Sequence, residues 1–247
     1  MLSDPFFLFT AITAILLIAI SKAGFGGMMG SIAVPLVALS VSAPQAAAIL
    51  LPIMLVMDTT GLLVFRGKAD AVNLRVMLPG AMVGLVLGAV FFRWVDARWI
   101  KAIIGIEALL FGLSRLRPTG KSNAPRPPET ARGVFWGCVS GFTSFISHAG
   151  GPPILQYLLP QEMERVRMVA TMTIFFSVVN FTKLIPYAIL GLLDTSNLMT
   201  SAFLLPVVPL GYWIGLKLLK TLSQALFNRI ITVAMILTGV KLLYDIL

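Results

Sequence analysis

Charge is what this sequence has least of. Asp, Glu, Lys and Arg together make up 12% of its 247 residues, whereas a soluble domain carries about 25% because its surface faces water. Apolar residues make up 58%, and the mean hydropathy is +0.94. These values exclude an ordinary soluble domain and predict a surface that faces lipid.

Cysteine and histidine are almost absent too. Cys138 and His148 are each the only residue of their type, which excludes an internal disulfide, a multi-cysteine metal site and a histidine pair. The twelve methionines are scattered without such partners, so packing explains them better than copper binding does. We therefore expect no metal site and no cofactor.

Two sequence signals are also missing. The nucleotide-binding pattern G-x-x-x-x-G-K-[ST] does not occur, so any transport would depend on a gradient or on the membrane potential. The N-terminal stretch MLSDPFFLF lacks the basic region and the cleavage site of a signal peptide, and we expect the first helix to be retained. The net charge of +9 is interpreted as a topology signal, with no nucleic-acid partner, because no RNA-binding motif accompanies it.

Long apolar blocks fill the rest of the chain. A bilayer core about 30 Å thick needs about 20 apolar residues per crossing, which these blocks supply. We expect an all-α integral membrane protein with a first membrane repeat at 1–116, a basic cytoplasmic linker at 117–132 and a second repeat at 133–247. The expected hydrophobic segments are 6–22, 28–41, 44–65, 72–92, 96–116, 131–145, 150–160, 165–188, 198–217 and 228–246.

The two halves share a register. A Gly-x-x-Asp-x-x-Asn-Leu pattern that begins at Gly67 recurs at Gly191, 124 residues later. Four further matches follow at an offset of 127: Pro79, Gly84, Gly88 and Gly112 with Pro206, Gly211, Gly215 and Gly239. Two nearly constant offsets indicate a duplicated unit with one small insertion.

The distribution of basic residues predicts how the two units are oriented. With five segments in each unit, 13 basic residues fall on one side of the membrane and 4 on the other, as the positive-inside rule requires. An odd number of segments inserts the second unit upside down. The sequence therefore predicts two inverted-topology repeats of about five hydrophobic segments each, in the cytoplasmic membrane, with both termini outside.

Each repeat opens with a glycine-rich break, at Ser21–Pro35 and at Ser140–Gln156. The breaks could be tight turns at the membrane surface, or they could separate half-helices whose tips meet near the midplane. Non-helical backbone at membrane depth occurs only inside protein or along a cavity, and paired interruptions often mark a transporter's binding site. Helix N-termini near Met28 and at 151–153 would then favour an anion.

These stretches also carry a resemblance. The GFGGMMG sequence before a proline-bearing helix, the later SHAGGPP and the basic linker resemble the TauE/SafE sulfite exporter family over essentially the whole chain. The resemblance implies export, or in some members uptake, of sulfite, sulfonates and related anions through the cytoplasmic membrane. The matching motif positions are Gly24, Gly26, Gly27, Gly30, His148, Gly150, Gly151 and Pro152.

Ionisable residues inside the apolar segments need a partner or a task. His148 could be a structural hydrogen-bonding group, a donor to the ligand or a proton carrier. Asp58 aligns with Asn180 at an offset of 122, so both repeats are expected to contribute to one cavity. Lys183 could pair with Asp58, contact the anion or extend to the membrane interface. For Glu107 a structural hydrogen bond to a neighbouring helix is expected.

The expected function is a secondary transporter of a small anion that works by alternating access. The expected substrate-binding residues are Gly24, Gly26, Gly27, Met28, Gly30, Ser147, His148, Gly150, Gly151, Pro152, Asn180, Thr182 and Lys183, and the expected coupling or charge-pair residues are Asp58, Lys183 and His148. The expected partners are the anion and the lipid bilayer, and a homo-oligomer is left open. We do not expect an enzyme. The alternatives are an intramembrane enzyme, with a dyad of His148 and Ser144 or Ser147, and a membrane assembly protein without transport.

Overall fold

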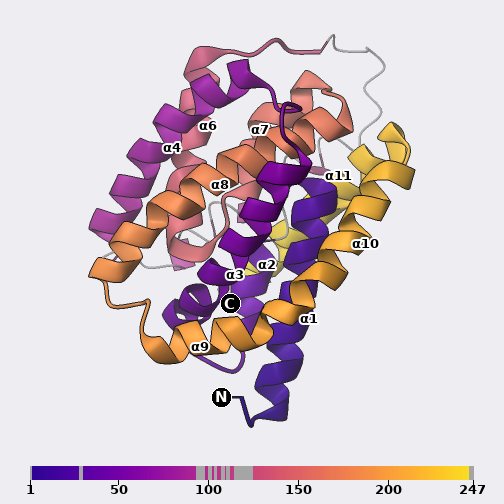
Figure 1. The fold of residues 1–247 in the computed structure, drawn as a ribbon. Helices are drawn as coiled ribbons and strands as arrows, with labels where there is room; N and C mark the ends of the chain where they lie inside the picture. The colour runs from indigo at the N-terminus through magenta and orange to yellow at the C-terminus, as the bar shows by residue number, and fades with distance from the viewer. Residues whose placement is uncertain are drawn as a thin grey trace.

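The structure is a computed structural model that describes residues 2–27, 30–92, 98, 99, 102, 105, 106, 109, 112, 113 and 125–244. All regular structure in that part of the chain is helical, as expected. The helices are α1 (Pro5–Phe25), α2 (Gly30–Val37), α3 (Ala43–Val64), α4 (Ala71–Phe91), α6 (Thr130–Ser147), α7 (Gly151–Leu158), η1 (Leu159–Gln161), α8 (Arg165–Ile189), α9 (Thr195–Leu204), η2 (Leu205–Val207), α10 (Val208–Thr221) and α11 (Gln224–Tyr244). Figure 1 shows them packed as one bundle.

Several expected segments differ from the helices that form. The segment at 198–217 lies within one membrane-length span, Thr195–Thr221, in which the turn η2 separates α9 from α10. Pro206 and Pro209 have no N–H to donate, and the chain tightens into a 3-10 turn beside them. The expected linker at 117–132 ends earlier, since α6 begins at Thr130. Most of the expected segment at 96–116 lies outside the described residues.

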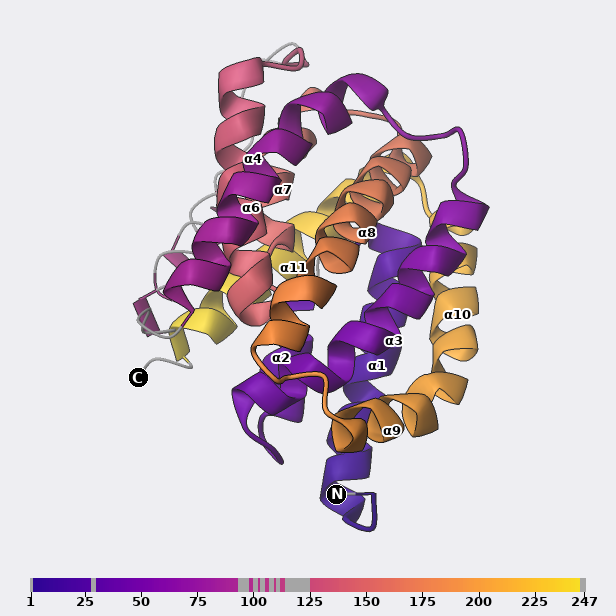
Figure 2. The ribbon, with the colours of Figure 1, turned by 60° about the vertical axis from the view of Figure 1, so that its left-hand side comes forward.

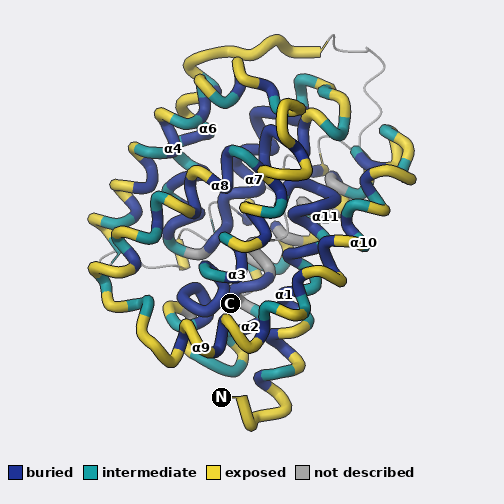
Figure 3. The backbone as a smooth tube through the Cα atoms, in the orientation of Figure 1, coloured by how far each residue is buried: buried dark blue, intermediate teal, exposed yellow. Residues whose placement is uncertain are grey.

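The helices of the described chain meet the requirements of a multi-pass membrane protein. Five spans are long and apolar enough to cross a bilayer: Pro5–Phe25, Pro44–Val64, Ala71–Phe91, Arg165–Ile189 and Thr195–Thr221. Large apolar side chains such as Leu63, Ile189 and Phe9 are exposed on the outside of the bundle, while the buried backbone runs through its centre (Figure 3). In water such a surface would be unfavourable, but in lipid it is not.

The repeated Gly-x-x-Asp-x-x-Asn pattern forms the same local structure twice. Gly67 and Gly191 adopt positive φ angles of 74° and 71°, which glycine tolerates best. Asp70 then caps α4 by accepting a 2.9 Å hydrogen bond from the Asn73 N–H. Asp194 caps α9 in the same way. The pattern is therefore a turn followed by a helix N-cap.

Glycines also allow two pairs of helices to approach closely. On α4, Gly84 and Gly88 lie against the backbone carbonyls of Cys138 and Phe142 on α6. On α10, Gly211 and Gly215 lie against the carbonyls of Leu16 and Ile20 on α1. A Cβ at these glycines would collide with the facing helix. The corresponding glycines of the two contacts are 127 positions apart in the sequence, and the residues whose carbonyls they face are 122 positions apart. Figure 2 shows α4 beside α6 and α10 beside α1.

Four connections gather at one end of the bundle, the upper end in Figure 1. Arg167, at the start of α8, pairs with Asp70 in the α3–α4 turn. The Arg126 N–H, before α6, donates to the Pro160 carbonyl, and the Arg165 N–H donates to Gln224 at the start of α11. The opposite end holds a hydrogen bond between Gln45 on α3 and Asn197 on α9. The loops that carry basic residues are thus neighbours in space.

Candidate functional site

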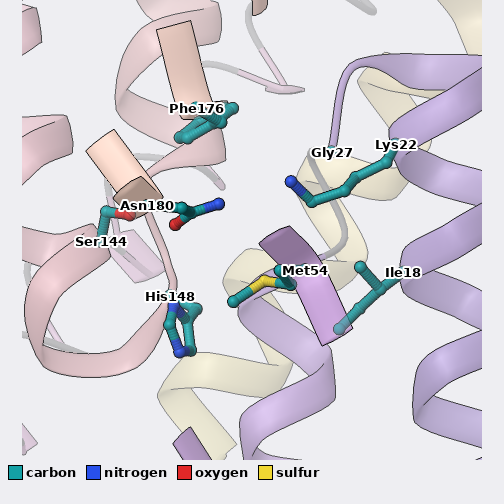
Figure 4. Close-up of a pocket in the computed structure, with 8 residues that line it drawn as sticks. All are labelled: Ile18, Lys22, Gly27, Met54, Ser144, His148, Phe176 and Asn180. Atoms are coloured by element: carbon teal, nitrogen blue, oxygen red, sulfur yellow. The ribbon is translucent and has the colours of Figure 1, made fainter. Parts of the chain in front are cut away.

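A small cavity lies between α1, α3, α6 and α8 (Figure 4). Its volume of about 20 Å³ suits roughly one water molecule. The residues that line it are Ile18, Lys22, Gly27, Met54, Ser144, His148, Phe176 and Asn180. These residues come from both halves of the chain.

The C-terminal ends of α1 and α6 bring the two chain breaks to this cavity. Gly26 ends α1 with φ 71°, and His148 ends α6 with φ 53°. In each case the next N–H bonds back six residues, from Gly27 to the Ser21 carbonyl and from Ala149 to the Thr143 carbonyl. Both helices thus end at a residue in the left-handed αL conformation, which reverses the chain within a few residues.

Lys22 and Asp58 form a buried ion pair in the wall of the cavity. The Lys22 ammonium group contacts Asp58 Oδ1, and the side chains are 10% and 1% exposed. Removing two charges from water is costly, and such a pair adds little net stability. Loss of one partner costs about 3–5 kcal/mol because the other charge is left buried. The pair is therefore better explained by function than by stability.

Asn180 connects this pair to a second buried lysine. Its amide nitrogen donates to Asp58 Oδ2 at 2.7 Å, and its amide oxygen accepts from the Lys183 ammonium group at 3.1 Å. Lys183 is 0% exposed and also donates to Ser144 Oγ at 2.8 Å. Carboxylates lie within ion-pairing distance of Lys22, Arg132 and Arg167 in the described chain, but not of Lys183.

His148 holds the other side of Lys183. Its Nδ1 lies 3.1 Å from the Lys183 ammonium nitrogen, and its Nε2 lies 3.2 Å from the Ala47 carbonyl oxygen. An ammonium group can only donate, so Nδ1 is the acceptor, and the carbonyl assigns the ring proton to Nε2. The ring is thus a neutral imidazole held between two helices.

Basic groups outnumber acidic groups beside the cavity. Lys22 and Lys183 each place an amino group there, and Asp58 is the carboxylate that lies within ion-pairing distance of Lys22. An unbalanced buried charge is expensive in a bilayer. The arrangement therefore favours a ligand that brings negative charge.

The lining residues also occur as pairs that are 122 positions apart. Lys22 and Ser144 both line the cavity, and so do Met54 and Phe176. The two helix ends at Gly26 and His148 have the same spacing. The expected pair of Asp58 and Asn180 joins them, since the two residues are directly hydrogen bonded.

Most predicted glycines shape the site from outside the cavity. Gly24 packs against the backbone of Gly215, and a Cβ at Gly26 would overlap Met172. Gly150 lies against Ser140, whose hydroxyl donates to the Gly150 carbonyl at 2.7 Å. Gly151 and Pro152 are buried in the first turn of α7. Gly27 is the predicted glycine that lines the cavity.

Two predicted roles are corrected. Lys183 does not pair with Asp58, because Lys22 takes that carboxylate and Asn180 separates the two. Its complete burial also excludes extension to the membrane interface. Thr182 points away from the site: its hydroxyl donates to the Val178 carbonyl and contacts Met82 on α4.

Met28 and Glu107 lie outside the described residues, and Gly30 and Ser147 are described only as parts of α2 and α6. The predicted anion site at the start of α7 has fewer donors than expected, because Pro152 and Pro153 have no N–H. The cavity is lined mainly by side chains instead.

Sequence reasoning missed Lys22 as a site residue, and it missed the apolar wall of Ile18, Met54 and Phe176. The offset of 122 that relates Asp58 to Asn180 also relates Lys22 to Ser144 and Met54 to Phe176. Applying it along the whole of both halves would have indicated these two pairs. It would not have identified Asp58 as the partner of Lys22.

Comparison with known proteins gives one match. A search of curated proteins and a search of solved structures found none. The family model described as "Sulfite exporter TauE/SafE" matches residues 11–242, which is nearly the whole chain. Five membrane-length helices, and a cavity lined by a buried lysine, agree with a membrane transporter of a small anion. The chain belongs to the sulfite exporter TauE/SafE family.

Proposed function

We propose that this protein is a secondary transporter that exports sulfite, a sulfonate or a related small anion across the cytoplasmic membrane. The observation that carries the proposal is the excess of basic side chains beside the buried cavity, where Lys22 pairs with the carboxylate of Asp58 and the buried Lys183 contacts Asn180 instead. A buried ammonium group attracts an anion strongly because little solvent screens it. The family supplies the chemical class of that anion.

The cavity offers complementary contacts for such an anion. Lys22 supplies charge, and the neighbouring Ser144 and Asn180 supply polar groups. Ile18, Met54 and Phe176 form an apolar wall that would accept the carbon substituent of a sulfonate. Because the cavity has room for roughly one water molecule, the helices around it have to separate before the anion can bind.

Alternating access between two inverted halves would provide that movement. The paired lining residues, the paired helix ends at Gly26 and His148, and the paired glycine contacts all support a duplicated unit. In Figures 1 and 2, α1 begins at the lower end of the bundle and α6 at the upper end, which supports opposite orientations. Transporters built this way rock one half against the other around a central site.

The same arrangement supports a topology. The loops that carry most of the basic residues lie at one end, and we assign that end to the cytoplasm by the positive-inside rule. Both termini then lie outside. A monoanion that leaves a cell with a negative interior gains about 2.3 kcal/mol per 100 mV, so export needs no other energy source.

The test is flux in proteoliposomes that contain the purified full chain. Radiolabelled sulfite, sulfate and methanesulfonate are each loaded inside, and their release is followed with and without a pH gradient. Saturable release of sulfite or methanesulfonate, reduced at least about tenfold in Lys22→Gln, is the expected result. If, for all three anions, release equals that from loaded liposomes that lack the protein, the proposal is refuted. That result would instead favour a membrane assembly protein, whose cavity residues tolerate replacement.

A further inference from the structure

The ammonium group of Lys22 lies between two environments. On one side it contacts Asp58 Oδ1. On the other side Lys22 lines the cavity, opposite Ser144 and Asn180, as Figure 4 shows. One cation is therefore available both to a carboxylate of the protein and to anything that enters the cavity.

Asp58 stands behind Lys22. Its residue is 1% exposed, and it is not among the residues that line the cavity. Its second oxygen is occupied by the Asn180 amide at 2.7 Å. An anion in the cavity thus reaches Lys22 without displacing Asp58 from its own position, because only the lysine has to turn.

We propose that Asp58 is a built-in counter-anion: it neutralises Lys22 while the carrier is empty, and the transported anion takes its place on Lys22 when it binds. This inference rests on the proposed function. Asp58 is then a positioning residue that acts through Lys22, and it competes with the substrate for the same ammonium group. The carrier can return empty because the charge of Lys22 is never left without a partner.

Loss of the Asp58 charge should therefore separate two modes of transport. In Asp58→Asn the empty carrier holds the charges of Lys22 and Lys183 with no carboxylate among the described cavity residues, and closing the site around them becomes unfavourable. The carrier with bound anion can still close its site, since the anion itself supplies the missing negative charge. Exchange of anion for anion should persist while net efflux fails.

Asp58→Asn should tighten the binding of the anion, whereas a substitution that only disrupts the site would weaken it. A ligand binds more weakly when its site is occupied by a competitor for most of the time. Removal of that competitor in Asp58→Asn should lower the Kd for methanesulfonate, by about tenfold. A merely structural role for Asp58 would raise the Kd or leave it unchanged.

The experiment compares net efflux and exchange of radiolabelled sulfite in proteoliposomes, with the membrane potential held at zero by potassium and valinomycin. Net efflux is measured into anion-free buffer, and exchange into buffer with unlabelled sulfite. We expect Asp58→Asn to reduce net efflux at least about tenfold and to keep exchange within about threefold of the unchanged protein. Asp58→Glu should restore net efflux. Asp194→Asn, which removes a carboxylate outside the cavity, should behave like the unchanged protein.

The outcomes separate the inference from the function on which it rests. No saturable sulfite movement by the unchanged protein in either mode would refute the proposed function. Movement by the unchanged protein together with an equal loss of both modes in Asp58→Asn, or a loss of neither, would overturn the role of Asp58 alone. If Asp58→Asn does not purify as a monodisperse protein, the inference is tested on the unchanged protein alone, by comparing its net efflux with its exchange. Net efflux within about tenfold of its exchange supports the inference, and exchange without net efflux overturns it.

Discussion

The side-chain amide of Asn180 donates a 2.7 Å hydrogen bond to the carboxylate of Asp58, although the two residues are 122 positions apart. They lie on α3 and α8, the third α-helix of one half of the sequence and the third α-helix of the other. Asn180 also accepts from Lys183. Polar contacts therefore run from Lys22 through Asp58, Asn180 and Lys183 to His148, and they connect helices of the first and second halves of the sequence beside the cavity.

Lys183→Gln should abolish transport without preventing membrane insertion. The substitution removes a buried charge that holds Ser144, His148 and Asn180 in place, so the cavity loses both charge and order. We expect sulfite flux to fall at least about tenfold, as measured in proteoliposomes. Lys220→Gln, which changes an exposed lysine on α10, is the matched control. Equal flux in both variants would show that Lys183 is dispensable.

Transport should decline on acidification, and His148 should be the cause. Protonation of Nδ1 would replace its hydrogen bond from Lys183 by two adjacent cations, with Lys22 across the cavity and the Tyr187 ring and the Ala47 carbonyl on the other sides. His148→Asn keeps a side chain that tolerates positive φ but cannot be protonated in this way. Its methanesulfonate exchange should stay level as the pH is lowered, while that of the unchanged protein falls once Nδ1 takes up a proton. Parallel pH profiles would assign the acid effect to another group.

Gly84→Ala should destabilise the bundle, because the added Cβ overlaps the Cys138 carbonyl on α6. Forcing two packed helices apart costs about 1–3 kcal/mol. The readout is the temperature at which half of the detergent-solubilised protein aggregates. Gly67→Asn is the control, since nothing lies within 4 Å of its Cβ position and asparagine tolerates positive φ. A drop confined to Gly67→Asn would contradict the close packing of α4 on α6.

Asp70→Asn should lower stability more than Asp194→Asn does. Both residues cap a helix through the N–H three positions later, and asparagine is itself a good cap. Asp70 additionally pairs with Arg167 of α8, and loss of that partly exposed pair should cost about 1 kcal/mol. The same aggregation assay compares the two variants. An equal or larger effect of Asp194→Asn would mean that the ion pair contributes nothing.

The part of the fold that could be predicted is the part set by signals that act within a few residues along the sequence. Apolar blocks, Asp caps and the glycines at positive φ act within a few residues of themselves, so their helices and turns are visible in the sequence. The 3-10 turn within the segment expected at 198–217 was not predicted, because the effect of Pro206 depends on whether neighbours compensate for its missing N–H. His148 was predicted as a site residue from its place in the second break and in the SHAGGPP motif, and Lys183 from its charge inside an apolar segment.

The sequence by itself determined the membrane class, the family and the places of the two breaks, and an offset of 122 residues related Asp58 to Asn180. These follow from composition, from turn chemistry and from residue spacing, which can all be read along the chain. Only the tertiary structure decided that Lys22 forms the ion pair with Asp58 and that Lys183 contacts Ser144 and His148. It also decided that Thr182 contacts Met82 and not the cavity. Partners across helices depend on how each helix is rotated about its axis, and that rotation is set by packing among all the helices at once.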